Sequence, residues 1–220
     1  MTETQAARPP DSPVRKRRSD GERSRNAILR EAAKLATVDG ISGLSIGRLA
    51  DAVGMSKSGL FAHFGSKEEL QIATIETARV VFDEQVIEPA LDAPDGVARL
   101  HSYVDHYLLH ISSGIYPGGC FFASLLTEMD THAGPIRDRA VEVMDGWIAL
   151  LAAAARDAQA EGLIDASEDP AQIAFEVEAS LFLANLQFVV VQNATPLDRA
   201  RRAIELRLAA AAPAAQRALG

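Results

Sequence analysis

The sequence is short of cysteine and of aromatic residues, and each shortage limits what the chain can be. Cys120 is the single cysteine among 220 residues, which excludes an internal disulfide and fits a reducing cytoplasm. Aromatic residues make up only 5% while alanine and leucine are abundant, a balance that favours helices over sheets. Few runs alternate with the period of two that a half-buried strand requires, so we expect an all-α fold.

Motifs for catalysis or metal binding are also missing. His106 and His110 have the i, i+4 spacing of a zinc pair, but no HExxH motif and no cysteine pair supports them. They are better read as polar positions that line a pocket or cover the surface, as is His101. With no acid/base, metal or cofactor motif, we expect no enzyme activity, no cofactor and no metal site.

The net charge of −8 argues against a nucleic-acid partner until it is divided along the chain. Residues 1–67 contain 12 basic and 7 acidic residues, a net of +5. Residues 68–220 contain 10 basic and 23 acidic residues, a net of −13. This asymmetry is typical of a basic nucleic-acid-binding head on an acidic body.

Residues 1–19 are proline-rich and polar, and they contain a basic run from Arg15 to Arg18. They lack the apolar segment of a signal peptide. Because such a composition cannot form a core, we expect a disordered basic arm over 1–19. The arm either settles on DNA phosphates or in a minor groove, or only keeps the chain soluble, and both interpretations stay open.

Residues 45–70 predict a helix, a tight turn and a second helix, followed by the start of a third. Gly54 ends the first helix, since glycine enters the left-handed region without strain. Ser56 is a good N-cap for the second helix, and Ser66 with Glu69 forms a capping box for the third. A helix-turn-helix with a polar, cationic outer face has the geometry that enters a DNA major groove.

Residues 54–70, GMSKSGLFAHFGSKEEL, resemble the signature of the tetracycline-repressor (TetR) family of bacterial regulators. Family members usually carry one or two tyrosines just before the His-Phe pair, where this chain has Phe61 and Ala62. The resemblance implies a three-helix DNA-binding head and a C-terminal helical bundle. It also implies that the last two helices form a four-helix bundle with those of a partner subunit.

Polar, basic and small residues of the helix-turn-helix are the candidate DNA contacts. Helix N-termini and lysine charges attract phosphate, whereas Arg48 could bind phosphate or read a guanine edge. His63 has a counterpart in the family, but a hydrogen bond that holds the turn together is an equal alternative. The predicted set is Ser45, Arg48, Ser56, Lys57, Ser58, Gly59, Phe61, His63 and Lys67.

Glycine and proline divide the remaining chain into helices. Residues 20–68 are expected to form the DNA-binding domain, which begins with a helix over 24–39, and 69–220 the effector-binding and dimerisation domain. One long helix over 66–91 is apolar on several sides, so it should touch both domains and transmit movement between them. The other expected helices cover 95–112, 120–130, 135–162 and 170–193, with a last one from Thr195.

The segment from Phe175 to Val191 is the most apolar in the chain, but we expect it to be too short and too polar to span a membrane. A soluble helix that is apolar nearly all round must be buried on both sides. We therefore expect the two final helices to form a homodimer interface. The predicted interface residues are Phe188, Val191, Leu197, Ile204 and Leu208.

Large apolar side chains from several body helices predict a cleft for a small, largely apolar effector. The predicted pocket residues are Phe82, Leu108, Cys120, Phe121, Phe122, Trp147, Leu151 and Phe182. Cys120 starts a helix, where a thiol can have a lowered pKa, but burial for packing is the favoured interpretation.

Together these features predict a homodimeric transcriptional regulator that binds a palindromic operator in double-stranded DNA, most simply a repressor that a small effector releases. A thiol or electrophile sensor that acts through Cys120 is the alternative within this class. A helical enzyme that merely carries such a head is the alternative outside it.

Overall fold

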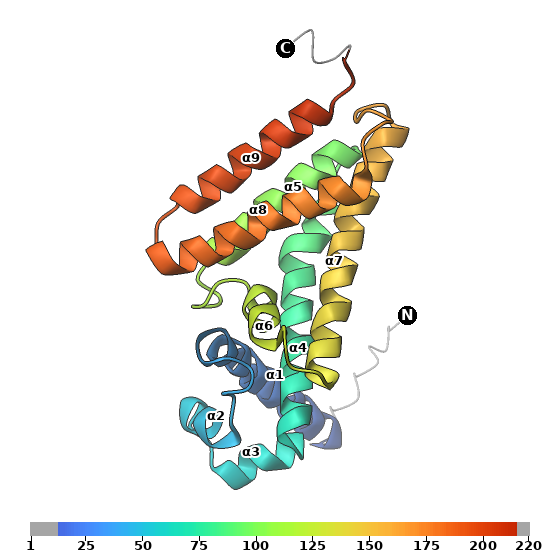
Figure 1. Ribbon diagram of the computed structural model, residues 1–220. Helices are drawn as coiled ribbons and strands as arrows, with labels where there is room; N and C mark the ends of the chain where they lie inside the picture. The colour runs from blue at the N-terminus through green and yellow to red at the C-terminus, as the bar shows by residue number, and fades with distance from the viewer. Residues whose placement is uncertain (1–12, 215–220) are drawn as a thin grey trace, which may run out of the picture.

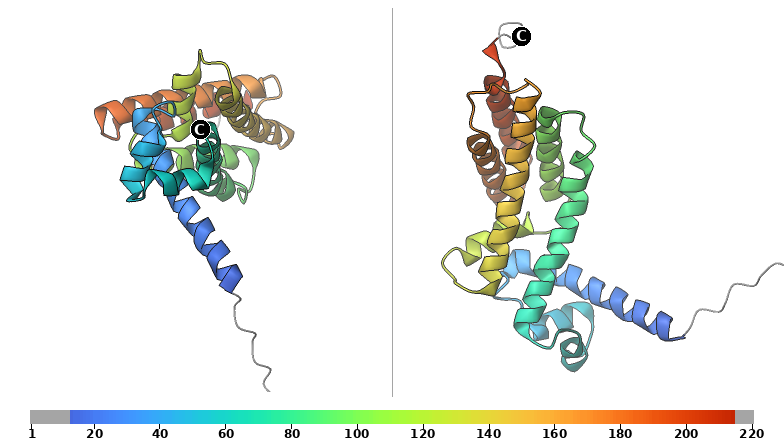
Figure 2. Two further views of the ribbon diagram at one scale, coloured as in Figure 1. Left: turned by 90° about the horizontal axis from the view of Figure 1, so that it is seen from below. Right: turned by 90° about the vertical axis from the view of Figure 1, so that its right-hand side faces the viewer.

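The computed structural model describes residues 13–214 and the side chains of 21–214. Those residues form helices and loops with no strand, which confirms the all-α prediction. Three helices, α1 (Pro13–Asp39), α2 (Ile46–Val53) and α3 (Lys57–Phe64), form a head at one end of an elongated molecule (Figure 1). Long helices along the main axis form the body, and α1 crosses beneath them and projects to one side (Figure 2).

The caps predicted for the helix-turn-helix are present. Gly54 ends α2 at φ 67°, in the left-handed region. The Ser56 hydroxyl accepts a hydrogen bond from Gly59 N at 3.1 Å, and that of Ser66 accepts one from Glu69 N at 3.1 Å. These bonds satisfy N–H groups that a helix start otherwise leaves without partners, so local chemistry fixes where α3 and α4 begin.

A small apolar core holds the head together. Leu49, Leu60 and Phe64 are buried against the inner face of α1, and the guanidinium of Arg25 lies 5.1 Å from the centre of the Phe64 ring. This core fixes the angle between α2 and α3. The outer face of α3 is left free to meet a ligand.

The connector between head and body is not one uniform α-helix as predicted. It consists of α4 (Lys67–Phe82), a π-helical turn η1 (Asp83–Ile87) and a 3-10 turn η2 (Glu88–Ala90). The π-helical turn shifts the residues that follow relative to the face of α4. It places Gln85 against buried His110, whose Nδ1 lies 2.6 Å from Gln85 Oε1.

The body contains α5 (Gly96–Ser112), α6 (Phe121–Met129), α7 (Pro135–Ala160), α8 (Pro170–Val191) and α9 (Thr195–Ala211). α8 packs between α7 and α9, and the short α6 sits where the body meets the head (Figure 1). The N-caps of α5 and α8, Asp95 and Asp169, accept hydrogen bonds from Ala98 N and Ala171 N.

Two predictions about helix ends are wrong. Helix α1 begins at Pro13, inside the arm expected to be disordered over 1–19, because proline suits the first turn and arginine and lysine favour helices; residues 1–12 lie outside the described residues. The pair Thr195-Pro196 predicts that Thr195 caps the last helix, but the cap of α9 is Ala194, and the side chain of Asn193 accepts from Thr195 N.

The apolar segment from Phe175 to Val191, expected to be too short and too polar to span a membrane, lies within the longer helix α8. Its 22 residues have the length and composition of a membrane-spanning helix, and a third of its most apolar window is buried inside the molecule. Length alone therefore does not separate a core helix of this kind from a spanning one.

Candidate nucleic-acid interface and effector cavity

The predicted DNA-facing residues gather around α2, α3 and the start of α4. Ser45 and Ser56 are the N-caps of α2 and α3, and their hydroxyls already accept from Arg48 N and Gly59 N. Lys57 and Ser58 occupy the exposed first turn of α3. The first turn of α3 therefore presents backbone N–H groups beside a lysine charge, an arrangement that suits phosphate.

Two of the three basic candidates already have partners within the head. An NH2 nitrogen of Arg48 lies 2.7 Å from Asp39 Oδ2, which ties α2 to the end of α1. Lys67 Nζ donates to the carbonyl of Ser42 at 2.6 Å. Lys57 instead extends over Gly47, where an added Cβ would lie 3.2 Å from Lys57 Cε. Among the described basic candidates, Lys57 is thus the one with no internal ion pair or hydrogen bond.

The rest of the set is split between surface and interior. Phe61 is 52% exposed, although it is a large apolar side chain. Gly59 is partly covered, since an added Cβ would lie 3.1 Å from Ser56 Oγ. Within the described residues the His63 side chain makes no hydrogen bond, and its ring lies 6.1 Å from that of Phe64. The alternative role of His63, a hydrogen bond that holds the turn, therefore has no support.

A small, partly open cavity lies in the body, where α4, α5, α6, α7 and α8 converge. Its volume is about 30 Å³, which leaves space for one water molecule. Aromatic rings form most of its wall: the Phe82 and Trp147 rings meet edge to face at 5.3 Å, and Trp147 stacks on Tyr107 at 6.2 Å. The lining residues are Phe82, Tyr107, Cys120, Phe122, Ala123, Leu126, Val143, Met144, Trp147, Glu178 and Phe182.

Five of the eight predicted pocket residues line this cavity: Phe82, Cys120, Phe122, Trp147 and Phe182. The other three, Leu108, Phe121 and Leu151, are buried in the core away from it, which corrects that part of the prediction. A size-based choice could not distinguish them, because core and cavity wall require the same apolar side chains.

Sequence reasoning missed six lining residues, and two of them, Tyr107 and Glu178, carry polar groups. Trp147 Nε1 donates to Glu178 Oε2 at 2.7 Å, and burial raises the pKa of the Glu178 carboxyl to about 7 although this hydrogen bond opposes the shift. A signal for Glu178 was available, since it is one of the few polar residues that interrupt the most apolar segment of the chain.

Cys120 is only 2% exposed and lies at the cavity wall. Burial raises the pKa of its thiol, despite opposing hydrogen bonds from the Ala123 and Phe122 backbone and the Tyr107 side chain. Cys120 N donates to Asn185 Oδ1 at 2.7 Å, which joins the start of α6 to α8. The geometry is that of a packed structural cysteine and not of an exposed thiolate.

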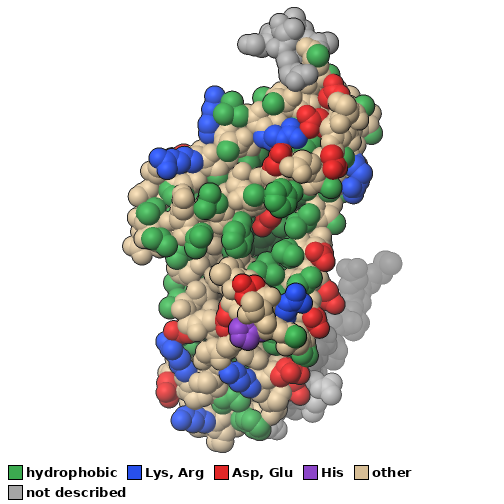
Figure 3. All heavy atoms as spheres, in the orientation of Figure 1, with side chains coloured by type: hydrophobic (Ala, Val, Ile, Leu, Met, Phe, Trp, Pro, Cys, Tyr) green, Lys and Arg blue, Asp and Glu red, His purple; other side chains and the backbone are tan. Residues whose placement is uncertain are grey.

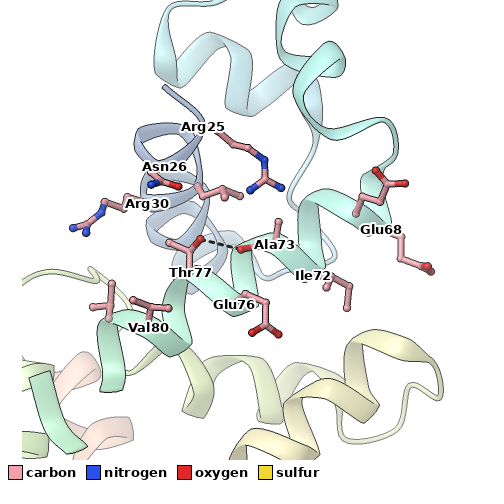
Figure 4. Close-up of a pocket in the computed structure, with 12 residues that line it drawn as sticks. Arg25, Asn26, Arg30, Glu68, Ile72, Ala73, Glu76, Thr77 and Val80 are labelled. Carbon is pink, nitrogen blue, oxygen red and sulfur yellow. Dashed lines mark hydrogen bonds between the residues drawn. The ribbon is translucent and has the colours of Figure 1, made fainter. Parts of the chain in front are cut away.

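A larger concavity lies elsewhere, in the groove between α1 and α4 (Figure 4). It has a volume of about 630 Å³ and carries charges of both signs, with Arg25 and Arg30 on α1 and Glu68 and Glu76 on α4. Because it is open to solvent and carries charged side chains at its rim, it does not fit a largely apolar effector.

The predicted interface residues do not share one surface. Leu197, Ile204 and Leu208 are buried inside the protomer, at 8%, 2% and 5% exposure, because the apolar stripe of α9 faces its own α8 and α5. The prediction that these three side chains lie at the dimer interface is wrong, because they are not on the surface of the protomer. Of the other two, Val191 is exposed and Phe188 is partly buried.

Other side chains form the exposed apolar face. Figure 3 shows hydrophobic side chains gathered over α8. The exposed ones on α8 and α9 are Phe175, Leu183, Leu186, Val190, Val191 and Leu206.

The short helix α6 contacts both the cavity and the head. Its first half lines the cavity through Phe122, Ala123 and Leu126. Near its end, Glu128 Oε2 accepts from Ile41 N at 2.6 Å and Oε1 accepts from Ser42 N at 2.8 Å. Both amides lie in the turn between α1 and α2, so one carboxylate links the body to the helix-turn-helix.

Comparison with known proteins decides the family. Residues 28–74 match the model for "Bacterial regulatory proteins, tetR family", and residues 96–204 match the model for "Tetracyclin repressor-like, C-terminal domain". The chain belongs to the TetR family. It is therefore a DNA-binding transcriptional regulator and not an enzyme.

Individual relatives agree with this assignment. The transcriptional regulator AcuR of Cereibacter sphaeroides is 25% identical over 175 residues, covering 76% of this chain and 79% of that protein. A TetR regulator from Chloroflexus aurantiacus J-10-FL superposes with a TM-score of 0.79 at 25% identity, covering 84% and 94% of the two chains. AibR, solved with isovaleryl coenzyme A and operator DNA, has a TM-score of 0.64 at 26% identity, covering 81% and 94%.

Proposed function

We propose that this TetR-family regulator is a ligand-responsive repressor. As a homodimer it binds a near-palindromic operator in the cytoplasm, and it releases the DNA when a small, largely apolar effector enters the body. One observation carries the proposal: α6 lines a small aromatic cavity at one end and holds the α1–α2 turn through Glu128 at the other.

The helix-turn-helix supports binding at the major groove. The exposed first turn of α3, with Lys57 and Ser58, would approach phosphates, while Phe61 would lie against the sugar-phosphate wall or a base. Arg48 and Lys67 would act mainly by fixing the head, because their charges are already paired with Asp39 and with the Ser42 carbonyl. The other predicted contacts stay part of the proposed interface.

The exposed face of α8 supports a two-fold dimer. Phe175, Leu186 and Val190 would be covered by the same face of a second copy, since large apolar patches are rarely left in water. We assign this face to a partner and not to a membrane because α8 also carries Glu176, paired with Arg207 of α9, and Glu178, bonded to Trp147. Acidic groups held in this way belong to a water-soluble packing arrangement.

Release would follow from a population shift. A cavity of about 30 Å³ cannot hold an effector without displacing its walls, so binding must favour a body in which α6 and α4 have moved. Because Glu128 and Gln71 both bond the Ile41–Ser42 turn, movement of either helix would change the orientation of the head. The change in operator affinity is limited by the effector's differential affinity for the two body states.

A thiol sensor is the weaker alternative. Cys120 is buried and its pKa is raised, whereas a sensor thiol has to be exposed and ionised.

The test is selection of bound DNA from a random pool, followed by a gel shift with the selected site and with DNA from upstream of the protein's own gene. A specific, palindromic site that small apolar compounds release is expected. The absence of any preferred site would contradict the proposal.

A further inference from the structure

The cavity described above has a distinct electrostatic character. Its wall is aromatic and apolar except for the groups of Tyr107, Cys120, Trp147 and Glu178. It is lined by no lysine, arginine or histidine, within the part of the chain that the structure describes. Its single ionisable acid therefore faces the cavity without a counter-charge.

Glu178 makes one hydrogen bond within residues 21–214: its Oε2 accepts the Trp147 indole N–H at 2.7 Å. The side chain is partly buried, and its Oε1 is not one of the buried oxygens that lack a partner among the described residues. Burying a carboxyl without a cation or a full set of donors costs free energy, and burial accordingly raises its pKa to about 7. A positively charged group placed beside Oε1 would remove that cost by stabilising the ionised form.

The surrounding rings favour the same kind of charge. Phe82 lies in contact with Trp147 and also with Phe122, whose ring centre is 6.0 Å away. Trp147 and Tyr107 stack nearly parallel, at 17°. The faces of aromatic rings attract cations, tryptophan most strongly, and a carboxylate beside several rings is a general way to hold an organic ammonium ion.

We propose that the effector is a small organic cation, an amine or quaternary ammonium with an apolar body, whose charge is held between Glu178 and the aromatic wall. This inference rests on the proposed ligand-responsive function and names the chemical class of its ligand. It also separates this cavity from that of a regulator such as AibR, solved with isovaleryl coenzyme A, because the phosphates of such a ligand would meet no basic side chain here.

Phe182 lies between the small cavity and a neighbouring space. Phe182 and Ala123 line both the cavity and a neighbouring groove of about 320 Å³ between α6 and α8. Rotation of the Phe182 side chain would join the two spaces. The cation would then enter along the groove and push against α6, the helix that carries Glu128.

The chain supplies its own reporter, because Trp147 is the single tryptophan and lines the cavity. Full-length protein is titrated with phenyltrimethylammonium and with tert-butylbenzene, a neutral isostere of the same shape. Trp147 fluorescence reports binding, and a gel shift on the selected operator reports release. Phenylacetate serves as the anionic probe.

The variant is Glu178→Gln, which keeps the side-chain volume and an acceptor for the Trp147 N–H. The matched control is Glu176→Gln, two residues before Glu178 on the same helix, where the acid pairs with Arg207 outside the cavity. Both variants are first checked for helical content and operator binding.

In the wild type we expect phenyltrimethylammonium to bind about tenfold to a hundredfold more tightly than tert-butylbenzene, and phenylacetate more weakly than either. Glu178→Gln should remove most of this preference and Glu176→Gln should keep it.

Equal binding of the cation and its isostere, no binding of the cation, or unchanged preference in Glu178→Gln would overturn the inference. In those cases operator release by tert-butylbenzene would still support the proposed function. An operator that no probe releases and a protein without a preferred site would count against the proposed function itself.

Discussion

The bond between Glu128 and the α1–α2 turn gives the sharpest test of how body and head communicate. Both carboxylate oxygens are used, Oε2 by Ile41 N at 2.6 Å and Oε1 by Ser42 N at 2.8 Å. Glu128→Gln replaces one oxygen by an NH2 group. That donor would then face a backbone N–H, so one bond is lost and the other loses its charge.

The magnitude follows from the type of bond. A hydrogen bond to a charged group contributes roughly 1.5–3 kcal/mol, and Glu128 is partly exposed, which reduces this. We therefore expect Glu128→Gln to weaken docking of the turn by about 2 kcal/mol. The turn keeps the bonds from Gln71 to the Ile41 carbonyl and from Lys67 to that of Ser42, so the head should loosen without unfolding.

Amide hydrogen exchange measures this loosening directly. A loss of about 2 kcal/mol corresponds to roughly thirtyfold faster exchange at Ile41 and Ser42, if exchange follows local opening. Operator affinity should fall by no more than that factor for each half-site, because DNA binding must then re-order the turn. The control is Asp130→Asn, which removes a charge from an exposed residue just after α6. Exchange rates at both amides equal to those of the control would refute the reasoning.

Four further outcomes are expected. Lys57→Ala should weaken binding to all DNA sequences alike and flatten the dependence of log affinity on log salt by about one unit, measured by fluorescence anisotropy; an unchanged slope would remove Lys57 from the phosphate contacts. Leu186→Asp should give monomers in sedimentation while Leu91→Asp, at another exposed leucine, should not, because a carboxylate in an apolar interface costs several kcal/mol. The pKa of Glu178 is raised from 4.5 to about 7 on folding, so the native state binds more protons and the free energy of unfolding falls as pH rises through this interval. In urea unfolding, Glu178→Gln should therefore be more stable than the wild type by up to about 3 kcal/mol at pH 8 and equally stable at pH 4. Parallel plots of unfolding free energy against pH for the two proteins would contradict this. Cys120→Ser should lower stability by about 1 kcal/mol without changing effector response, whereas loss of oxidant-induced operator release in this variant would favour the thiol sensor.

Local chemistry made the head predictable. The ends of α2, α3 and α4 are set by Gly54, Ser56 and Ser66, whose roles depend on neighbours within four residues. Such interactions can be recognised in sequence because they need no knowledge of the tertiary fold. The exceptions are Arg48 and Lys67, whose partners Asp39 and Ser42 are distant in sequence.

The faces of the last two helices were less predictable, for a physical reason. Periodicity predicts that α9 has one apolar stripe, and the stripe through Ile204 and Leu208 is real. It does not say whether that stripe meets its own chain or another. Because α8 is apolar nearly all round, α9 packs on one side of it and the opposite side is left exposed.

The cavity required tertiary information of a second kind. Phe121 and Phe122 are neighbours on α6 and equally apolar, yet Phe122 lines the cavity and Phe121 does not. A period of 3.6 places them about 100° apart, and the direction of the cavity is fixed by α4, α5, α7 and α8. Among the lining residues that the prediction missed, Glu178 could have been singled out in sequence, because an acid in an apolar run requires a partner.

The proposed coupling acts over a short distance because α6 is short. Glu128 at the head lies six positions after Phe122 at the cavity, which is less than two helical turns, or about 9 Å along the axis. Over so short a distance a helix held by packing at both ends moves as a rigid body, so displacement at the cavity cannot be absorbed before it reaches Ile41 and Ser42. Gly118, just before α6, reinforces this: its N–H donates to Thr37 Oγ1, and an added Cβ would lie 1.9 Å from the Thr37 carbonyl oxygen. Both ends of the α6 region therefore rest against the end of α1 or the turn that follows it, and an effector that moves α6 must move the head or break these contacts.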